Sequence, residues 1–218
     1  LALFMVIPYI ISNVLGGKIE SEAVLALIEG GLRLLIFVLY VVAISQMKEI
    51  KRVFRYHGAE HKSINCIENG LPLTVENVRK QSREHKRCGT SFLLYVMIIS
   101  VIFFLFIRVS TPWLRILFRL LLIPVIAGVA YEFIKLAGRS NSKVMNVLSR
   151  PGFWVQRLTT AEPDDAMIEV AIASVEAVFD WREFLGMKEE AEEKKDTAKK
   201  KKKKGKKKEN AVQSKKEE

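Results

Sequence analysis

Residues 91–107 read SFLLYVMIISVIFFLFI, a run of seventeen residues without a charged side chain. As a helix, this run is near the lower limit of length for crossing the hydrocarbon core of a bilayer. Further apolar runs occupy residues 1–15, about 31–47 and about 113–134. Half of the 218 residues are hydrophobic and 27% are charged, and the two kinds are segregated along the chain. The sequence therefore predicts an all-α, polytopic helical membrane protein with about four transmembrane helices.

The formal net charge of +11 comes from two segments of the chain. Residues 48–89 contain ten Lys and Arg against five Glu, a net of +5. Residues 188–218 contain fourteen Lys against eight acidic residues, a net of +6. The loops at 16–22 and 108–112 are short and nearly neutral. Because positively charged loops tend to remain in the cytoplasm, we expect residues 48–89 and the C-terminus on that side.

The same patterns divide the chain into segments. The chain begins at Leu1 inside an apolar run, so we expect that its natural N-terminus is missing. The lysine-rich end is too highly charged to bury a core and is predicted to be disordered. The predicted segments are the first two transmembrane helices (1–47), a cytoplasmic helical loop bearing His, Glu and Cys (48–89), transmembrane helices three and four (90–135), a cytoplasmic segment with an amphipathic helix (136–187) and the disordered tail (188–218).

The amphipathic helix is predicted to start at Pro163-Asp164-Asp165, where acidic residues can cap it and favour its dipole. Apolar residues then recur at spacings of four, three and four, at Ile168, Ile172, Val175 and Phe179. We expect this stripe to dock on the cytoplasmic loop or to lie on the membrane surface.

Charged residues also fall near the starts of two predicted membrane helices, Glu29 and Arg33 in the second and Arg115 and Arg119 in the fourth. Ionisable groups at such depth are costly and usually pair or line a polar cavity. One interpretation is interfacial snorkelling, with Glu29 and Arg33 paired four residues apart. The other is an inter-helix pair between Glu29 and the face formed by Arg115 and Arg119.

The stretch YHGAEHKSINC at residues 56–66 carries the candidate chemistry. Spacings of three and four over residues 47–68 predict one face of a helix that continues from the second span. His57 and His61 lie one turn apart on this face and could reach a single metal ion. The pattern His57-x-x-Glu60-His61 also matches the inverted zincin motif, in which the Glu activates metal-bound water. Glu60 would lie beside the histidine pair, which suits a general base.

All three histidines and both cysteines fall between positions 57 and 88. Glu68, His85 and Cys88 could therefore complete a ligand set with the histidine pair. The expected cofactor is a divalent metal, with zinc favoured by these ligand types. The alternative is a hydrogen-bonded polar cluster that holds no metal. A structural disulfide between Cys66 and Cys88 is not expected in a cytoplasmic loop.

An anion site is predicted near the start of the third span. Thr90 or Ser91 could cap that helix, whose first N–H groups and dipole favour an anion. Arg79, Arg83 and Arg87, spaced by four on one predicted helix, would add a row of cations beside it. A phospholipid headgroup or a phosphorylated substrate would fit such a corner. Ordinary juxtamembrane positive charge is the alternative interpretation.

Three stretches resemble the bacterial YqhQ family of membrane proteins: FRYHGAEHKSINC (54–66), LTVENVRKQSREHKRCGTSFLL (73–94) and RLTTAEPDDAMIEVAIASVEAV (157–178). The resemblance covers roughly residues 1–180. The family is uncharacterised and is described as predicted metal-dependent. The resemblance implies a multi-pass protein of a bacterial inner membrane with a metal-dependent activity, and it implies no particular substrate. The glycine-rich segment that usually precedes the first span in this family is not matched here.

The leading hypothesis is a metal-dependent membrane enzyme, a hydrolase that acts at the cytoplasmic membrane interface on a lipid-linked, phosphorylated or peptide substrate. The alternative is a non-catalytic adaptor or scaffold in the lipid bilayer. Its lysine tail would contact anionic lipid, ribosomal RNA or the translocon through charge, without sequence-specific nucleic-acid recognition. A transporter ranks third, because about four spans are few for one.

Overall fold

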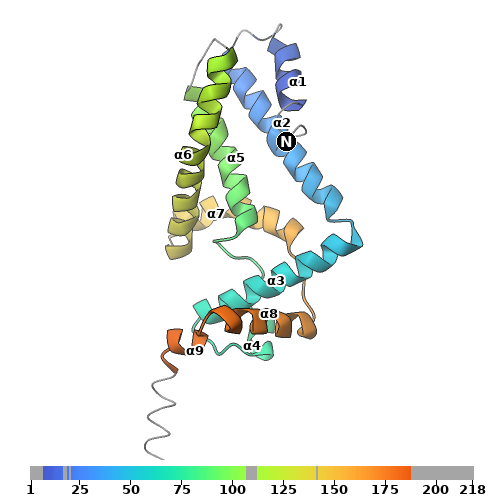
Figure 1. The fold of residues 1–218 in the computed structure, drawn as a ribbon, viewed down its shortest axis with the longest axis vertical. Coiled ribbons are helices and arrows are strands. Elements are labelled where there is room, and N and C mark those ends of the chain that lie inside the picture. Colours follow the sequence, from blue (N-terminus) through green and yellow to red (C-terminus); the bar gives the residue numbers. More distant parts are fainter. Residues whose placement is uncertain (1–6, 17–18, 20, 107–111, 141, 188–218) are drawn as a thin grey trace, which may run out of the picture.

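The computed structural model describes residues 7–16, 19, 21–106, 112–140 and 142–187, and the tail predicted at 188–218 lies outside them. All regular secondary structure in the described residues is helical (Figure 1), which confirms the all-α fold class. The helices in chain order are α1 (Ile7–Gly16), α2 (Glu22–Ile44), α3 (Lys48–Glu68), α4 (Val75–Arg79), α5 (Gly89–Phe106), α6 (Pro112–Arg139), α7 (Lys143–Thr159), α8 (Asp165–Val178) and α9 (Trp181–Phe184).

Three of the described helices are long and apolar enough to cross a membrane. The candidate spans are Ala23–Ile44 in α2, Gly89–Phe106 in α5 and Leu117–Arg139 in α6. Large apolar side chains on these helices face outward, as Leu35 (54% exposed) and Leu121 (62% exposed) illustrate. Apolar surface on this scale is stable in lipid and unfavourable in water. The length, composition and outward faces of these helices together indicate a membrane protein.

The second span begins earlier than the apolar run predicted. α2 starts at Glu22 rather than near residue 31, and the Ser21 side chain accepts a hydrogen bond from the Val24 amide at 3.5 Å. Charged residues interrupt the apolar run before residue 31, but a helix tolerates such residues when they are paired. The first predicted span, residues 1–15, lies partly outside the described residues, and its described part is α1.

The chain turns sharply between α2 and α3 (Figure 1). The sequence predicted one helix running on from the second span, whereas α2 ends at Ile44 and α3 begins at Lys48. Ser45 Oγ donates a hydrogen bond to the Val42 carbonyl at 2.7 Å and so satisfies one of the last carbonyls of α2. Polar side chains of this kind compete with the helical backbone bonds and allow the helix to end.

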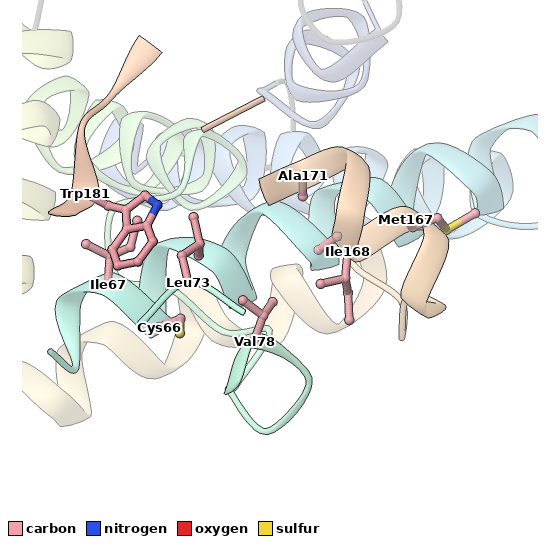
Figure 2. Packing of buried hydrophobic residues seen from close by; sticks show 9 residues of the cluster. Cys66, Ile67, Leu73, Val78, Met167, Ile168, Ala171 and Trp181 are labelled. Atoms are coloured by element: carbon pink, nitrogen blue, oxygen red, sulfur yellow. The ribbon is translucent and has the colours of Figure 1, made fainter. Parts of the chain in front are cut away.

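α3, α4, α8 and α9 pack around one apolar core, which Figure 2 shows in close-up. Val78 and Ile168 are fully buried in it (0% exposed). Burying apolar side chains of this size contributes about 1.5–3 kcal/mol each, so this core holds the layer of helices together. Its buried members are Ala59, Cys66, Ile67, Leu73, Val78, Met167, Ile168, Ala171 and Trp181.

α8 begins where the sequence predicted, because the Asp164 side chain accepts a backbone hydrogen bond at 2.9 Å. Ile168 is buried, and Ile172 and Val175 pack against the same core. The apolar stripe therefore docks on α3 and α4 instead of lying on a membrane surface. Phe179 follows the end of the helix and is 41% exposed.

α7 was not identified from the sequence. It runs across the lower ends of α5 and α6 in Figure 1, and the Tyr95 hydroxyl of α5 donates to the Leu148 carbonyl of α7 at 2.9 Å. A Cβ atom at Gly152 would lie 2.8 Å from Ser91 Oγ, so a larger residue there would force Ser91 or α7 to shift. α7 thereby links the membrane helices to the layer of α3, α4 and α8.

Candidate metal centre

His57 and His61 lie one turn apart on α3, and their ring centroids are 4.3 Å apart. Residues four apart share one face of a helix, so both rings point the same way. His57 Nδ1 is 2.9 Å from the Thr159 carbonyl oxygen, and His61 Nδ1 is 2.6 Å from the Arg83 carbonyl oxygen. Because a carbonyl can only accept, each Nδ1 carries a proton and donates it, and each Nε2 keeps its lone pair when the ring is neutral.

Cys88 completes a set of three donor atoms with the two histidines. Its Sγ lies 3.4 Å from His57 Nε2. The donor atoms of His57, His61 and Cys88, hereafter the donor triad, all lie within 4.8 Å of one another. Two imidazoles and a thiolate are ligands that zinc accepts, and three protein ligands leave a fourth position for water or substrate. The residues present therefore fit a metal ion of this kind.

The thiol and one imidazole of the donor triad have shifted pKa values. Burial alone would raise the pKa of Cys88 from its ordinary 9.0, but hydrogen bonds with His57, His61 and Thr90 outweigh burial and lower it to about 5. The hydrogen bond with Cys88 raises the pKa of His57 above its ordinary 6.5, against the opposing effect of burial. In the metal-free protein Cys88 is therefore a thiolate at neutral pH, and it makes the neighbouring His57 imidazole more basic.

Gly58, which follows His57, allows the segment after α7 to approach α3 closely. A Cβ atom at this position would lie 2.2 Å from the Ala161 carbonyl oxygen. The Ala161 amide donates to the Phe54 carbonyl at 2.9 Å and fixes the segment there. This packing brings the Thr159 carbonyl to His57, so the glycine in the HGAEH stretch serves the orientation of the histidine.

Gln156 fastens the loop between α4 and α5 to the end of α7. Its side chain is fully buried (0% exposed). Its Oε1 accepts from the His85 amide (2.8 Å), and its Nε2 donates to the His85 carbonyl and to Ser91 Oγ (2.7 Å each). The fastened loop carries both the Arg83 carbonyl and Cys88, so Gln156 positions two parts of the donor triad.

Gln156 and Thr159 were missed by sequence reasoning. The available signal was polar residues on the buried face of an amphipathic segment, but no pattern shows what such residues contact. Gln156 binds partners 65 and 71 residues away in the chain, and Thr159 reaches His57 across 102 residues.

His85 and Glu68, which the sequence placed in the ligand set, lie outside the donor triad. His85 Nε2 is 3.3 Å from Glu68 Oε2, and Arg87 pairs with the other oxygen of that carboxylate. The His85 ring centroid is 5.7 Å from that of His61. Burial lowers the pKa of His85, although Glu68 offsets part of that effect. These three residues form a separate polar network beside the triad.

Glu60 is exposed on α3, whereas its neighbour His61 is buried. Its carboxylate is not one of the clustered donor atoms. Its negative charge nevertheless contributes to the raised pKa of His57, after the larger effect of Cys88. Glu60 therefore lies beside the donor triad, as the helix geometry predicted, and not within it.

The predicted row of cations before the third span is wrong. α4 ends at Arg79, so Arg79, Arg83 and Arg87 do not share a helix. The Ser82 hydroxyl accepts a hydrogen bond from the Glu84 amide at 3.0 Å, a local bond that competes with continued helix.

Two of these arginines are instead paired with carboxylates, Arg79 with Asp165 and Arg87 with Glu68. Thr90 and Ser91 also differ from their predicted place, because α5 begins at Gly89 and both lie inside its first turn. Cys88 therefore precedes the helix in the cap position.

Glu29, Arg33 and Arg119 of the membrane helices form one network. Arg119 Nη1 and Nη2 each donate to an oxygen of Glu29 at 3.0 Å, and Arg33 donates to the same carboxylate at 2.8 Å. The predicted pair with Arg33 and the Arg119 part of the predicted inter-helix pair thus occur together. Arg119 also lies over the Phe104 ring, 5.1 Å from its centroid. The side chain of Arg115 lies outside the described part of the chain.

Fold and site together define an all-helical membrane protein with a His/His/Cys donor triad where its membrane helices meet a layer of shorter helices. Over residues 1–181 the chain matches the family described as "Protein of unknown function (DUF1385)". The chain belongs to this family.

The chain is similar to the uncharacterized protein YqhQ of Bacillus subtilis (strain 168). The two are 40% identical over 172 residues, which are 78% of this chain and 54% of the relative. The chain thus spans about half the length of that curated relative. The resemblance to the YqhQ family is confirmed. No solved structure matches the chain.

Proposed function

We propose that the chain is a metal-dependent membrane enzyme, a hydrolase whose zinc ion is held by His57, His61 and Cys88. The observation that carries the proposal is the donor triad, with its donor atoms within 4.8 Å of one another and both Nδ1 atoms bonded to backbone carbonyls. A histidine placed only for packing would need neither a fixed tautomer nor an Nε2 atom directed at a thiol.

Each residue of the site would have its own role in this enzyme. The donor triad binds the ion, and the Thr159 and Arg83 carbonyls orient the two imidazoles. A zinc ion bound there would polarise a carbonyl or phosphoryl group and lower the pKa of water. Glu60, exposed beside the triad, would accept and return the proton. A lipid-linked, phosphorylated or peptide substrate at the membrane interface would suit a site next to the start of α5.

Elemental analysis of the purified full-length protein tests metal binding. We expect about one zinc per chain, and its loss in a His57→Ala/His61→Ala double variant. The matched control is His85→Gln, because His85 is also a buried histidine but lies outside the donor triad. Metal-free wild type that folds normally in chelator would exclude the proposal.

Glu60→Gln tests catalysis separately from metal binding. The variant should retain its zinc and fold, and it should lose turnover on whichever member of a panel of phosphate esters, carboxylate esters and peptides the wild type cleaves. An adaptor without catalytic activity would cleave no member of the panel and would be indifferent to this substitution.

A second candidate function uses Cys88 as a nucleophile without metal. The lowered pKa of its thiol, about 5, and the contact with His57 favour a thiolate that attacks the carbonyl carbon of an ester or amide, forming a thioester while the alcohol or amine leaves with a proton from His57. In that case a chelator would leave turnover unchanged, and a thiol reagent that modifies Cys88 would abolish it. The zinc enzyme would respond to the chelator instead.

We also propose that residues 48–89 and everything after about residue 135 face the cytoplasm of a bacterial cell, with the lysine tail as a tether to anionic lipid or ribosomal RNA. The charge distribution supports this orientation. Single cysteines at Lys18 and Lys51, placed in a chain without native cysteines, test it with an impermeant thiol reagent on intact cells. Only position 18 should be labelled, and labelling at 51 would reverse the orientation.

A further inference from the structure

A basic pocket lies beside the turn that joins α2 to α3. It has a volume of about 460 Å³, within the range of small-ligand sites. Its charged lining consists of four cations and one carboxylate. The lining residues are Lys48, Lys51, Arg52, Arg55, Tyr56, Asp164, Ala166 and Met167, which come from the first turns of α3 and the start of α8.

Most of the positive charge in this pocket is not neutralised. Lys48, Lys51 and Arg52 form no ion pair with any residue that the structure describes. Arg52 lies over the Tyr56 ring, 5.9 Å from its centroid. Among the described residues, Arg55 is the one pocket cation with an ion pair, to Asp164 at 2.8 Å. The pocket therefore carries a net formal charge of +3, four cations less one carboxylate.

The pocket lies just beyond the end of a candidate membrane span, where a bilayer around α2 would present its headgroups. The candidate span in α2 ends at Ile44, and α3 begins at Lys48. Met47 and Val53 flank the cations and are 53% and 57% exposed. Apolar side chains beside lysine and arginine at the end of a span are typical of contact with the interface between headgroups and acyl chains.

We infer that this pocket binds the phosphate-bearing headgroup of an anionic phospholipid. The cations supply charge and donors for a phosphate, and Tyr56 supplies an aromatic ring with a hydroxyl, a residue type enriched at membrane interfaces. The N-terminus of α3, whose first residue Lys48 lines the pocket, has no side-chain cap, and helix N-termini favour anions. The bilayer that surrounds α2 provides such phosphates permanently, at the depth of the pocket.

The inference is independent of the proposed zinc enzyme. The pocket and the donor triad share no residue. Bound lipid would hold the first turns of α3 at the membrane surface, and α3 is the helix that also carries His57 and His61. Metal content and headgroup binding can therefore fail separately.

Calorimetric titration of the full-length protein in non-ionic detergent measures the binding directly. The probes are short-chain phosphatidylglycerol, short-chain phosphatidylcholine and inorganic phosphate. We expect saturable binding of phosphatidylglycerol, at least about tenfold tighter than either other probe, because one basic residue near an anionic surface is worth about fivefold. Equal affinity for inorganic phosphate would show a free-anion site and overturn the lipid assignment.

A triple variant, Lys48→Gln/Lys51→Gln/Arg52→Gln, should weaken phosphatidylglycerol binding by tenfold or more. The matched control is Arg139→Gln/Lys143→Gln/Arg150→Gln, which removes the same charge from exposed positions at the end of α6 and on α7. The lysine tail is present in every variant, so its contribution cancels. Equal weakening by both triple variants would show that binding depends on the total charge of the protein and not on the pocket, and would overturn the inference.

Asp164→Asn should increase the affinity for phosphatidylglycerol, a result that a misfolded protein would not give. The asparagine keeps the cap of α8, since its side-chain oxygen can still accept from the Met167 amide. It removes the carboxylate paired with Arg55 and frees that cation for the ligand. We expect phosphatidylglycerol binding to tighten by about two- to fivefold. Unchanged or weaker binding in a folded Asp164→Asn protein would overturn the inference.

Discussion

The surroundings of Cys66 and Cys88 differ sharply, although both cysteines are free and buried. Cys66 lies in the apolar core of α3, α4 and α8, where burial raises the pKa of its thiol. Cys88 lies among two imidazoles and a hydroxyl, and its pKa falls to about 5. Burial is common to both, so the neighbouring polar atoms decide whether the sulfur is an inert thiol or a thiolate.

One helix supplies both environments. His61 and Cys66 are five residues apart on α3, which places them about 140° apart around its axis. One face of α3 packs against α4 and α8, and the face carrying His57 and His61 meets the start of α5 and the end of α7. α3 thereby carries core residues on one face and the histidines of the donor triad on another. Substitutions on the two faces should have different consequences.

The largest difference should appear in metal binding. Cys88→Ala removes one ligand, and we expect zinc affinity to fall by more than about a hundredfold, because losing even an outer-shell partner of a metal site costs about 10- to 100-fold. Cys66→Ala should keep one zinc per chain. Competition with a chromophoric chelator measures both affinities. Equal loss in the two variants would show that the fold, and not the donor triad, controls metal content.

The second difference should appear in the thiolate titration of the metal-free protein. Ultraviolet absorbance of the thiolate should rise near pH 5 for Cys88, and for Cys66 only above the ordinary value of 9.0. Single Cys→Ala variants assign each step. A common midpoint above pH 8 would show that the imidazoles do not stabilise the Cys88 thiolate.

The same shifts fix the sign of the pH dependence. The lowered pKa of Cys88 contributes stability that is lost as pH falls through about 5. The raised pKa of His57 contributes stability that is present below 6.5 and lost as pH rises through its folded value. Between about pH 5 and 6.5 the contribution of Cys88 grows while that of His57 is still complete, so the stabilisation from the pair should rise with pH over this range.

The third difference concerns side chains that hold each region in place. Gln156→Leu leaves the amide and carbonyl of His85 without their partner, and unsatisfied buried groups cost about 1–3 kcal/mol each. We expect a lower melting temperature in detergent and about tenfold weaker zinc binding.

Asn77→Ala is the control in the other region, since Asn77 Nδ2 donates to the Pro72 carbonyl near Cys66 at 2.9 Å. It should lower stability less and leave zinc affinity unchanged. If Gln156→Leu retained full zinc affinity, the fastened loop would not be what positions Cys88.

The difference between the two regions also explains what the sequence could predict. Apolar runs and spacings of three and four depend on local periodicity, so the helical fold, the α8 stripe and the His57–His61 pair were predicted. The choice of Cys88 over His85 and Glu68 as third donor depends on where a loop is fastened. That fastening comes from Gln156 on α7, and no local pattern records a contact between residues 71 apart. The turn at Ser45 was missed for a related reason, because one hydroxyl ended a helix that the apolar pattern continued.

The smallest effect should come from Cys66→Ser. The Cys66 sulfur lies 3.4 Å from the Pro72 carbonyl oxygen and 3.7 Å from the Leu71 carbonyl oxygen, so a serine hydroxyl could donate to one of them. The remaining penalty is poorer packing and burial of a more polar atom, and we expect a loss of about 1 kcal/mol in unfolding free energy. Thermal unfolding in detergent measures it, with Cys66→Ala as the variant that cannot form the hydrogen bond. Zinc content should not change in either. If Cys66→Ser lost zinc as Cys88→Ala does, the two faces of α3 would be coupled, and the separation of packing from chemistry on this helix would be wrong.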